Sequence, residues 1–214
     1  TLQSFGNTMI PATSGELASG LVGEGRMAEP EAILNHIEAH MLQSMPLYGK
    51  TVLITAGPTY EAIDPVRFIG NHSSGLMGFE IANHAAQLGA EVLYITGPTH
   101  YKTDHSRIKT IPVVSAEEMY SQVHTYFKSV DIAILSAAVA DYKPKNTATS
   151  KIKKNSQTLS LELEKTKDIL ASLGTLKSHQ LLVGFALETN DEVANAIKKL
   201  KSKNLDLIVL NSLN

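Results

Sequence analysis

The chain has 214 residues, a net charge of −2, and apolar (43%) and charged (19%) fractions that are ordinary for a globular protein. It contains no cysteine, which excludes disulfides, thiolate metal sites and a cysteine nucleophile. No apolar run approaches the roughly 20 residues of a membrane-spanning helix, and no signal-peptide pattern opens the chain, so we expect a cytoplasmic protein without membrane partners.

Residues 1–49 differ in composition from the rest of the chain. Turn-forming residues dominate up to Pro30, and apolar residues at helical spacing predict one helix over 31–45. One helix without strands makes a poor core, so we interpret 1–49 as a tail or as part of another domain. A linker around Gly49 leads into the first predicted strand.

From Lys50 onward, predicted strands and helices alternate along the chain. Strands are predicted at 51–56, 91–96, 108–113, 131–136, 159–164 (exposed and antiparallel), 181–186 and 205–210. Helices are predicted at 75–88, 116–128 with Ser115 as N-cap, 166–173 and 191–202. This alternation predicts an α/β protein with a three-layer Rossmann-like fold, in which helices cover both faces of a mostly parallel sheet.

Polar clusters follow several of the predicted strands directly. They lie at 57–75, 97–105, 137–155 and 187–190. Ligands of parallel sheets bind beyond the carboxyl ends of the strands. We therefore expect these clusters to share one cleft.

The start of the helix after the first strand carries the strongest functional signal. It reads Ser73-Ser74-Gly75-x-x-Gly78. Free backbone N–H groups and the helix dipole favour an anion at such a position, and the serine hydroxyls would add donors. The structural alternative is that the serines only cap the helix. An NAD site does not fit, because the glycines come too late after the strand and the second strand lacks a terminal acidic residue, and no G-K-[ST] of a P-loop occurs.

Further polar residues near this segment are candidates for chemistry. Arg67 and Asn71 would provide a cation and an amide donor for a developing oxyanion, or Arg67 only pairs with Asp64 and Asn71 only braces a turn. For His72 we favour a structural hydrogen bond. Asp141 would hold a divalent cation or a ligand hydroxyl, or it caps a turn.

Lysines are concentrated in the C-terminal half, where twelve of sixteen lie between Lys143 and Lys203. This asymmetry favours a polyanionic small ligand, although a solvated surface is the alternative for any single lysine. The segment 143–157 is polar and basic, so we interpret it as a candidate lid over a phosphate site. Nucleic acid is a weaker fit, because the chain is slightly acidic and only 6% aromatic.

A series of motifs runs in order along residues 50–214. They are Gly57-Pro58-Thr59, Asp64-Pro65-Val66-Arg67, Asn71-x-Ser73-Ser74-Gly75-x-Met77-Gly78, Ala137-Ala138-Val139-Ala140-Asp141-Tyr142, Lys151-Ile152-Lys153, Gly184-Phe185-x-x-Glu188-Thr189 and Lys203-Asn204-x-Asp206. Together they resemble the bacterial phosphopantothenoylcysteine synthetases. Residues 1–45, through Ala18-x-Gly20-x-x-Gly23-x-Gly25-Arg26-Met27, resemble the end of the decarboxylase domain that precedes the synthetase in the bifunctional protein.

The resemblance implies a ligase of coenzyme A synthesis. It would join 4′-phosphopantothenate to L-cysteine through an acyl-cytidylate, using CTP and Mg²⁺ and releasing CMP and pyrophosphate. It also implies a homodimer, and FMN only in the decarboxylase domain of the full-length parent.

The resemblance also assigns roles to individual residues. Asn71 and Arg67 would bind and activate the acyl-cytidylate, and Lys151 would contact phosphate. Asn71, Ala137 and Ala138 would bind the substrate. The implied nucleotide-binding positions are Gly57, Ser73, Ser74, Gly75, Ala137, Asp141, Lys151, Lys165, Thr166, Lys167, Asp168, Phe185, Lys199 and Lys203.

Three departures from the family pattern affect these expectations. Ser19 stands where the decarboxylase pattern has cysteine and the flavin-binding body is absent, so we expect no decarboxylase activity from this chain. Leu76 stands where lysine is common, which would weaken nucleotide affinity. The chain ends at Asn214, where family members continue. The alternative function is a non-catalytic module that binds a nucleotide or phosphopantothenate, and the missing ribose-binding acid disfavours a Rossmann-type reductase.

Overall fold

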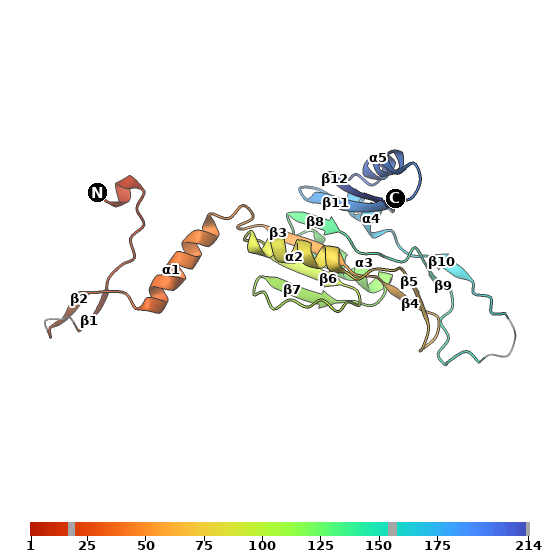
Figure 1. Cartoon of the computed structure of the whole chain (residues 1–214), viewed down its shortest axis with the longest axis horizontal. Coiled ribbons are helices and arrows are strands. Elements are labelled where there is room, and N and C mark those ends of the chain that lie inside the picture. The colour runs from red at the N-terminus through yellow and green to blue at the C-terminus, as the bar shows by residue number, and fades with distance from the viewer. Residues whose placement is uncertain (17–19, 154–157, 213–214) are drawn as a thin grey trace. The chain divides into compact units, whose positions relative to one another are not determined.

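The structure is a computed structural model that describes residues 1–16, 20–153 and 158–212 (Figure 1). The chain divides into two compact units, 1–48 and 49–214. The first unit contains a 3-10 helix at Gln3–Phe5, the antiparallel strands β1 (Thr13–Glu16) and β2 (Val22–Arg26), and helix α1 (Pro30–Gln43). Ser19 lies outside the described residues.

The β1–β2 hairpin shows that the prediction of a strand-free N-terminal region was wrong. Nearly all of its residues are exposed, and several are Gly, Ser or Glu. Strands are recognised in a sequence by apolar residues that alternate with polar ones, and this hairpin has no apolar face to produce that signal. The interpretation of 1–49 as the end of a decarboxylase domain stays a prediction.

The second unit is built on a six-stranded sheet in the order β12-β11-β8-β3-β6-β7, in which all neighbouring strands pair in parallel (Figure 1). The strands are β3 (Thr51–Ala56), β6 (Glu91–Thr96), β7 (Ile108–Pro112), β8 (Ile132–Leu135), β11 (Leu181–Glu188) and β12 (Leu207–Ser212). The helices are α2 (Leu76–Gln87), α3 (Ala116–Phe127), α4 (Ile169–Leu176) and α5 (Glu192–Ser202). The predicted fold class is confirmed.

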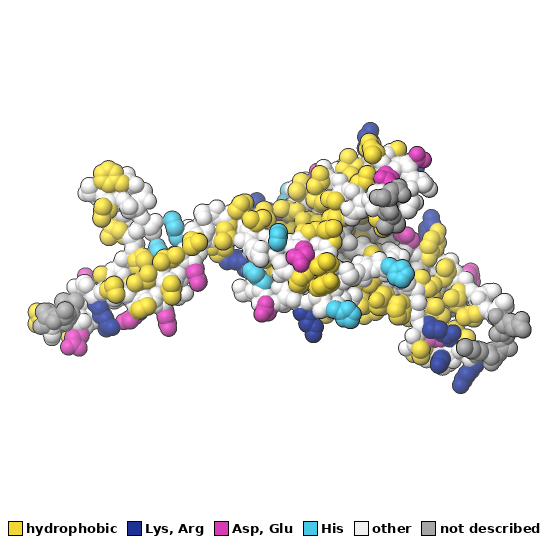
Figure 2. All heavy atoms as spheres, in the orientation of Figure 1, with side chains coloured by type: hydrophobic (Ala, Val, Ile, Leu, Met, Phe, Trp, Pro, Cys, Tyr) yellow, Lys and Arg dark blue, Asp and Glu magenta, His cyan; other side chains and the backbone are white. Residues whose placement is uncertain are grey.

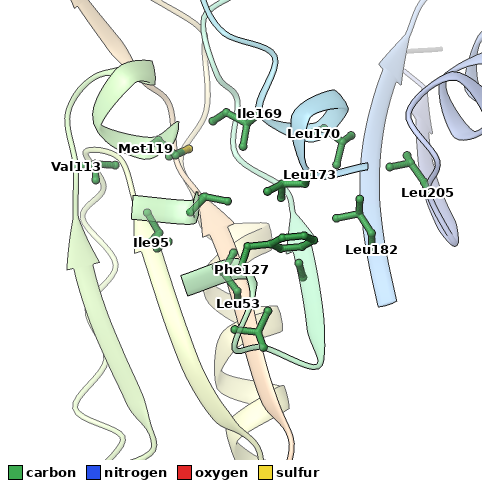
Figure 3. Close-up of a cluster of buried hydrophobic side chains, with 13 residues drawn as sticks. Leu53, Ile95, Val113, Met119, Phe127, Ile169, Leu170, Leu173, Leu182 and Leu205 are labelled. Atoms are coloured by element: carbon green, nitrogen blue, oxygen red, sulfur yellow. The ribbon is translucent and has the colours of Figure 1, made fainter. Parts of the chain in front are cut away.

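Helices cover both faces of this sheet. On one face Gly78 of α2 packs so closely on β3 that an added Cβ would lie 2.5 Å from Ala56 Cβ. On the other face α3 and α4 bury Phe127 and Leu173 in one apolar cluster with Leu53 of β3 (Figure 3). Because both faces are covered, the central strands are almost continuously apolar, which is what made them recognisable in the sequence.

Local signals place some helix starts as predicted and shift others. Ser115 caps α3 in a capping box, since its Oγ accepts from Glu118 N at 3.2 Å and the Glu118 carboxylate accepts from Ser115 N. Helix α4 begins at Ile169 rather than at the predicted Thr166, because Asp168 is its N-cap and accepts from Ala171 N at 2.9 Å.

Two small antiparallel hairpins extend from the second unit. They are β4 (Tyr60–Ala62) with β5 (Phe68–Gly70), and β9 (Tyr142–Pro144) with β10 (Leu163–Lys165). The strand predicted at 159–164 is therefore correct only at its end, and the other three strands were not predicted. In the part of the chain that the structure covers, the helices are too short or too polar to cross a bilayer.

Candidate functional site

The candidate site lies where the neighbouring strands β3 and β8 end. The loops that follow them continue side by side beyond the sheet. Ala138 N donates to Gly57 O at 2.9 Å, Thr59 N donates to Ala138 O at 3.3 Å, and Ala140 N donates to Thr59 Oγ1 at 2.9 Å. These bonds bring together Gly57 and the 137–141 segment, two regions that the sequence places about 80 residues apart.

The start of α2 lies beside the loop after β3. Gly75 is the N-cap, with φ at +82°, and an added Cβ would lie 3.3 Å from Gly57 Cα. The Ser73 and Ser74 hydroxyls accept from the backbone N–H groups of Gly75 and Leu76, both at 3.3 Å. The serines therefore brace the turn before the helix, and the cap position that we considered for them belongs to Gly75, because only glycine fits there.

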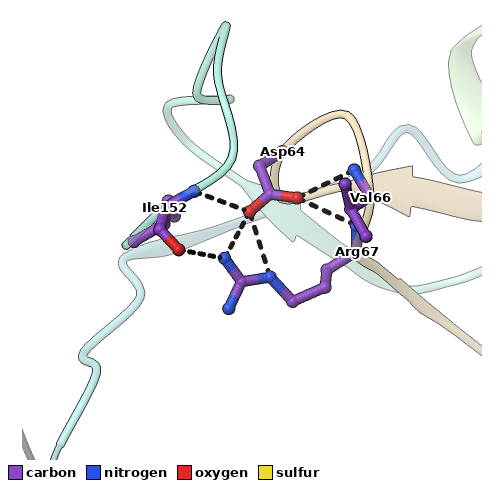
Figure 4. A network of polar contacts seen from close by, with 4 residues as sticks. All are labelled: Asp64, Val66, Arg67 and Ile152. Carbon is purple, nitrogen blue, oxygen red and sulfur yellow. Dashed lines mark hydrogen bonds and ion pairs between the residues drawn. The ribbon is translucent and has the colours of Figure 1, made fainter. Parts of the chain in front are cut away.

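The predicted catalytic residues are held by other parts of the site. Asn71 Nδ2 donates to Val139 O at 2.9 Å and so links the end of β5 to the loop after β8. Arg67 binds Asp64 through Nε (3.0 Å) and Nη2, and Nη2 also donates to Ile152 O at 3.0 Å (Figure 4). The pairing with Asp64, considered as the structural alternative, is thus present. It brings Arg67 next to the segment that carries Lys151.

Two other predictions near this cluster turn out differently. His72 is exposed, and its ring makes no hydrogen bond to a residue that the structure describes, so the structural bond expected for it is absent there. Of the candidate basic lid, residues 154–157 lie outside the described residues.

A pocket of about 510 Å³ opens beside the 137–141 segment, and its volume lies in the range of small-molecule sites. Many of the residues predicted to bind nucleotide line it: Ala137, Asp141, Lys165, Thr166, Lys167, Asp168, Phe185, Lys199 and Lys203. The others, Gly57, Ser73, Ser74, Gly75 and Lys151, lie outside the lining together with Arg67, Asn71 and Ala138. Sequence analysis missed the residues Thr55, Leu135, Val139, Tyr142, Ile169 and Leu170, which also line the pocket.

Several of the missed residues carried a usable signal. Thr55 and Leu135 pair with each other near the ends of β3 and β8, directly before the polar loops. The 137–141 segment connects the pocket to the residues before α2, since Val139 lines the pocket while its carbonyl accepts a hydrogen bond from Asn71. The polar segment 187–190, predicted to lie in the same cleft, does not line the pocket.

The pocket is rich in cations. Lys199 Nζ donates to Phe185 O at 2.8 Å, and burial together with the nearby Lys203 ammonium lowers the pKa of Lys199. Lys203 pairs with Asp168 at 2.7 Å. Although burial acts to raise it, the pKa of Asp168 is held below its usual value by Lys203 and the Ala171 N–H. A cluster of this kind favours a polyanionic ligand, because lysines outnumber carboxylates in the pocket lining.

Basic side chains also gather near the pocket. Figure 2 shows them around the β9–β10 end of the second unit. Lys167 pairs with Glu117 at 2.6 Å and lies over the Tyr120 ring, and the carboxylate raises the pKa of Lys167. Among the described residues, no group of three or more His, Asp or Glu side chains could hold a metal ion. Asp141, the predicted ligand of a cation or hydroxyl, is exposed in the pocket lining.

Comparison with known proteins matches residues 47–214 to the family described as the DNA/pantothenate metabolism flavoprotein C-terminal domain. Among curated proteins, the coenzyme A biosynthesis bifunctional protein CoaBC of Bacillus subtilis (strain 168) is 49% identical over 212 residues, which are 98% of this chain and 52% of that protein. A "Cysteine/Cysteine sulfinic acid decarboxylase" from an unknown prokaryotic organism is 52% identical over 217 residues, 99% of this chain and 60% of that protein. The chain thus spans little more than half of these relatives.

Solved structures agree with this assignment. The crystal structure of the C-terminal domain of the bifunctional protein CoaBC has a TM-score of 0.70 and 47% identity, covering 78% of this chain and 79% of that one. The DNA/pantothenate metabolism flavoprotein from Streptococcus pneumoniae has a TM-score of 0.69 and 26% identity, covering 77% and 83% of the two chains.

Proposed function

The chain belongs to the DNA/pantothenate metabolism flavoprotein C-terminal domain family, and we propose that it is the ligase part of a coenzyme A biosynthesis enzyme, joining 4′-phosphopantothenate to L-cysteine with CTP. The observation that carries the proposal is the continuity of the site. One short segment, 137–141, lines the lysine-rich pocket and also holds Asn71 beside the start of α2. A ligand with a flat base, a ribose and a charged tail would fit a site that extends from the pocket to the start of α2.

The pocket would hold the nucleoside, and the start of α2 would hold the phosphates. Small residues such as Ala137 leave room for a flat ring beside Phe185. Lys199 and Lys203 would donate hydrogen bonds to the base or ribose, and their charge would attract the polyanionic ligand to the pocket. At the start of α2, an anion would take over the backbone N–H groups that the serine hydroxyls now accept. The freed hydroxyls can then rotate and donate to the same anion.

The chemistry needs fixed donors and cations at two steps. A carboxylate oxygen of 4′-phosphopantothenate attacks the α-phosphorus of CTP, and pyrophosphate leaves. The cysteine amine then attacks the acyl carbon, loses a proton and forms the amide, and CMP leaves. Charge gathers at phosphorus or at a carbonyl oxygen in both steps. The Asn71 amide and the cations of the site are the groups of this chain that would stabilise it.

Mg²⁺ would enter this site with the nucleotide. Mg²⁺ is commonly bound through one or two carboxylates plus substrate phosphates, and the exposed Asp141 carboxylate fits such a role. Bound there, the ion would neutralise phosphate charge. FMN is no part of this proposal, since the resemblance places it in the decarboxylase domain of a full-length parent. We also propose a homodimer, which sedimentation velocity would test as a mass of twice the monomer.

Pyrophosphate release tests the proposed function. Sustained release from CTP should require both phosphopantothenate and cysteine, because the acyl-cytidylate forms only from the first and is discharged only by the second. Release that ignores phosphopantothenate would contradict the ligase proposal. CTP binding in a calorimeter without any turnover would instead select the non-catalytic binding module.

A further inference from the structure

Two residues of the β4–β5 hairpin, Asp64 and Arg67, bind the backbone N–H and the backbone C=O of Ile152 (Figure 4). The Ile152 N–H donates to Asp64 Oδ2 at 3.1 Å, and the Ile152 C=O accepts from Arg67 Nη2 at 3.0 Å. Nearby, Ala148 N donates to Ile63 O at 3.0 Å. A segment that lies 85 residues further along the chain therefore follows the hairpin closely and is fixed to it at two points.

The Asp64 carboxylate is the centre of this contact. Its side chain has 0% exposure. Oδ1 accepts from the backbone N–H groups of Val66 and Arg67, both at 2.9 Å, while Oδ2 accepts from Arg67 Nε and Nη2 and from the Ile152 N–H. The Arg67 guanidinium holds the pKa of Asp64 well below its usual range, against the opposing effect of burial. Asp64 is thus a fixed anion that orders the backbone at residues 66–67, the Arg67 side chain and the Ile152 peptide.

Lys151 and Lys153 lie directly before and after Ile152 in the chain. Both are exposed, and neither forms an ion pair within residues 1–16, 20–153 and 158–212. Consecutive Cα atoms are about 3.8 Å apart, so fixing Ile152 fixes the base of both side chains. Asn71 directly follows β5 of the same hairpin. One buried carboxylate therefore sets where Lys151 stands relative to Arg67 and Asn71.

We propose that Asp64 is a positioning residue, which holds the Ile152 peptide so that the Lys151 ammonium meets the phosphates of the bound nucleotide. Asp64 itself would touch no substrate. The nature of the ligand rests on the proposed function, whereas the fixing of the Ile152 peptide rests on the contacts of Asp64, Arg67 and Ile152 alone. If Asp64 served stability only, its loss would act independently of Lys151. As a positioning residue, it acts through Lys151.

A double-mutant cycle separates these two roles. Asp64→Asn keeps the size of the side chain but loses an acceptor and the charge, so in the intact protein the KM for CTP should rise about 10-fold or more. In a Lys151→Gln background the same change should add less than about 2-fold, since the ammonium that it places is gone. Equal costs in the two backgrounds would overturn the inference.

Asp131→Asn is a matched control. Asp131 also accepts a backbone N–H, from Thr51 at 2.8 Å, and also pairs with a cation, Lys50 at 3.3 Å. It lies at the opposite, amino end of β3 and β8, so its loss should lower Tm and leave the KM for CTP unchanged. An Asp64→Asn variant that behaved like this control would overturn the proposal.

Two further measurements keep the inference testable. If Asp64→Asn does not fold, Ile152→Pro removes the N–H that Asp64 accepts while it leaves Asp64 and Arg67 in place, and the same rise in KM is expected; an unchanged KM would contradict the inference. Hydrogen exchange of ligand-free protein gives a readout independent of activity. Exchange at the Ile152 amide should be about 10-fold or more faster in Asp64→Asn than in wild type or Asp131→Asn. If wild type neither binds nor turns over CTP, the ligase proposal fails, and unchanged exchange would still separately overturn the role of Asp64.

Discussion

At the scale of single residues, the Asn71 amide is the group that the proposed chemistry depends on most. Its Nδ2 already donates one hydrogen to Val139 O at 2.9 Å, which fixes the direction of the second hydrogen. A donor aimed in advance at a developing charge is worth more than one that must be ordered during the reaction. The position of Asn71 is therefore set by the protein rather than by the ligand.

Asn71→Ala should lower kcat by about 10²-fold or more, because a fixed donor to an oxyanion-like intermediate is lost. Single-turnover formation of phosphopantothenoylcysteine measures this step. Asn195→Ala is a suitable control, since Asn195 is an exposed asparagine of α5 whose side chain bonds only Glu188 and Asn190 among the described residues. A normal rate in Asn71→Ala would remove the catalytic role of this amide.

Residues of the site could be grouped from the sequence when they belong to one motif or follow neighbouring strands. The turn at Ser73 and Ser74 was found in this way, whereas most of the pocket lining was expected from the resemblance to the synthetase family. The contact of Arg67 and Asp64 with Ile152 was not predicted, because it joins their side chains to the backbone of a residue 85 and 88 positions away, and a backbone group has no signature in the sequence. Contacts made by a peptide group can be identified only from the fold.

At the scale of elements, the capping box of α3 gives a prediction on stability. Ser115 Oγ accepts from Glu118 N, and replacing an N-cap serine by alanine typically costs about 1 kcal/mol. Ser115→Ala should lower the free energy of unfolding by that amount in urea denaturation. Ser121→Ala, in the same helix and exposed, should have little effect. Equal stability of the Ser115 variant and wild type would show that the cap is not needed.

Elements with an apolar core face were predicted well, and those without one were missed. The strands β3, β6 and β11 are buried and read as apolar runs. The strands of the β1–β2, β4–β5 and β9–β10 hairpins are short, and nearly all of their residues are exposed or only partly buried. Their strands are paired by backbone hydrogen bonds, which almost any sequence can form, so composition does not reveal them.

At the scale of the whole second unit, the order of the strands explains where the site lies. From β3 the chain moves to β6 and β7, and it then returns to β8 on the other side of β3. Helix α2 leaves β3 on one face, whereas α3 and α4 cover the other. The helices that follow β3 and β8, which are α2 and α4, therefore lie on opposite faces of the sheet, and ligands of open α/β sheets bind at the carboxyl end of such a reversal. The pocket and the start of α2 lie at the two sides of this reversal.

A crystal structure with CTP bound is the most direct test of this account. We predict the base beside Ala137 and Phe185, and phosphate oxygens within about 3.2 Å of the backbone nitrogens at the start of α2. A triphosphate bound elsewhere, with residues 71–75 turned away from it, would contradict the claim that the two parts form one nucleotide site.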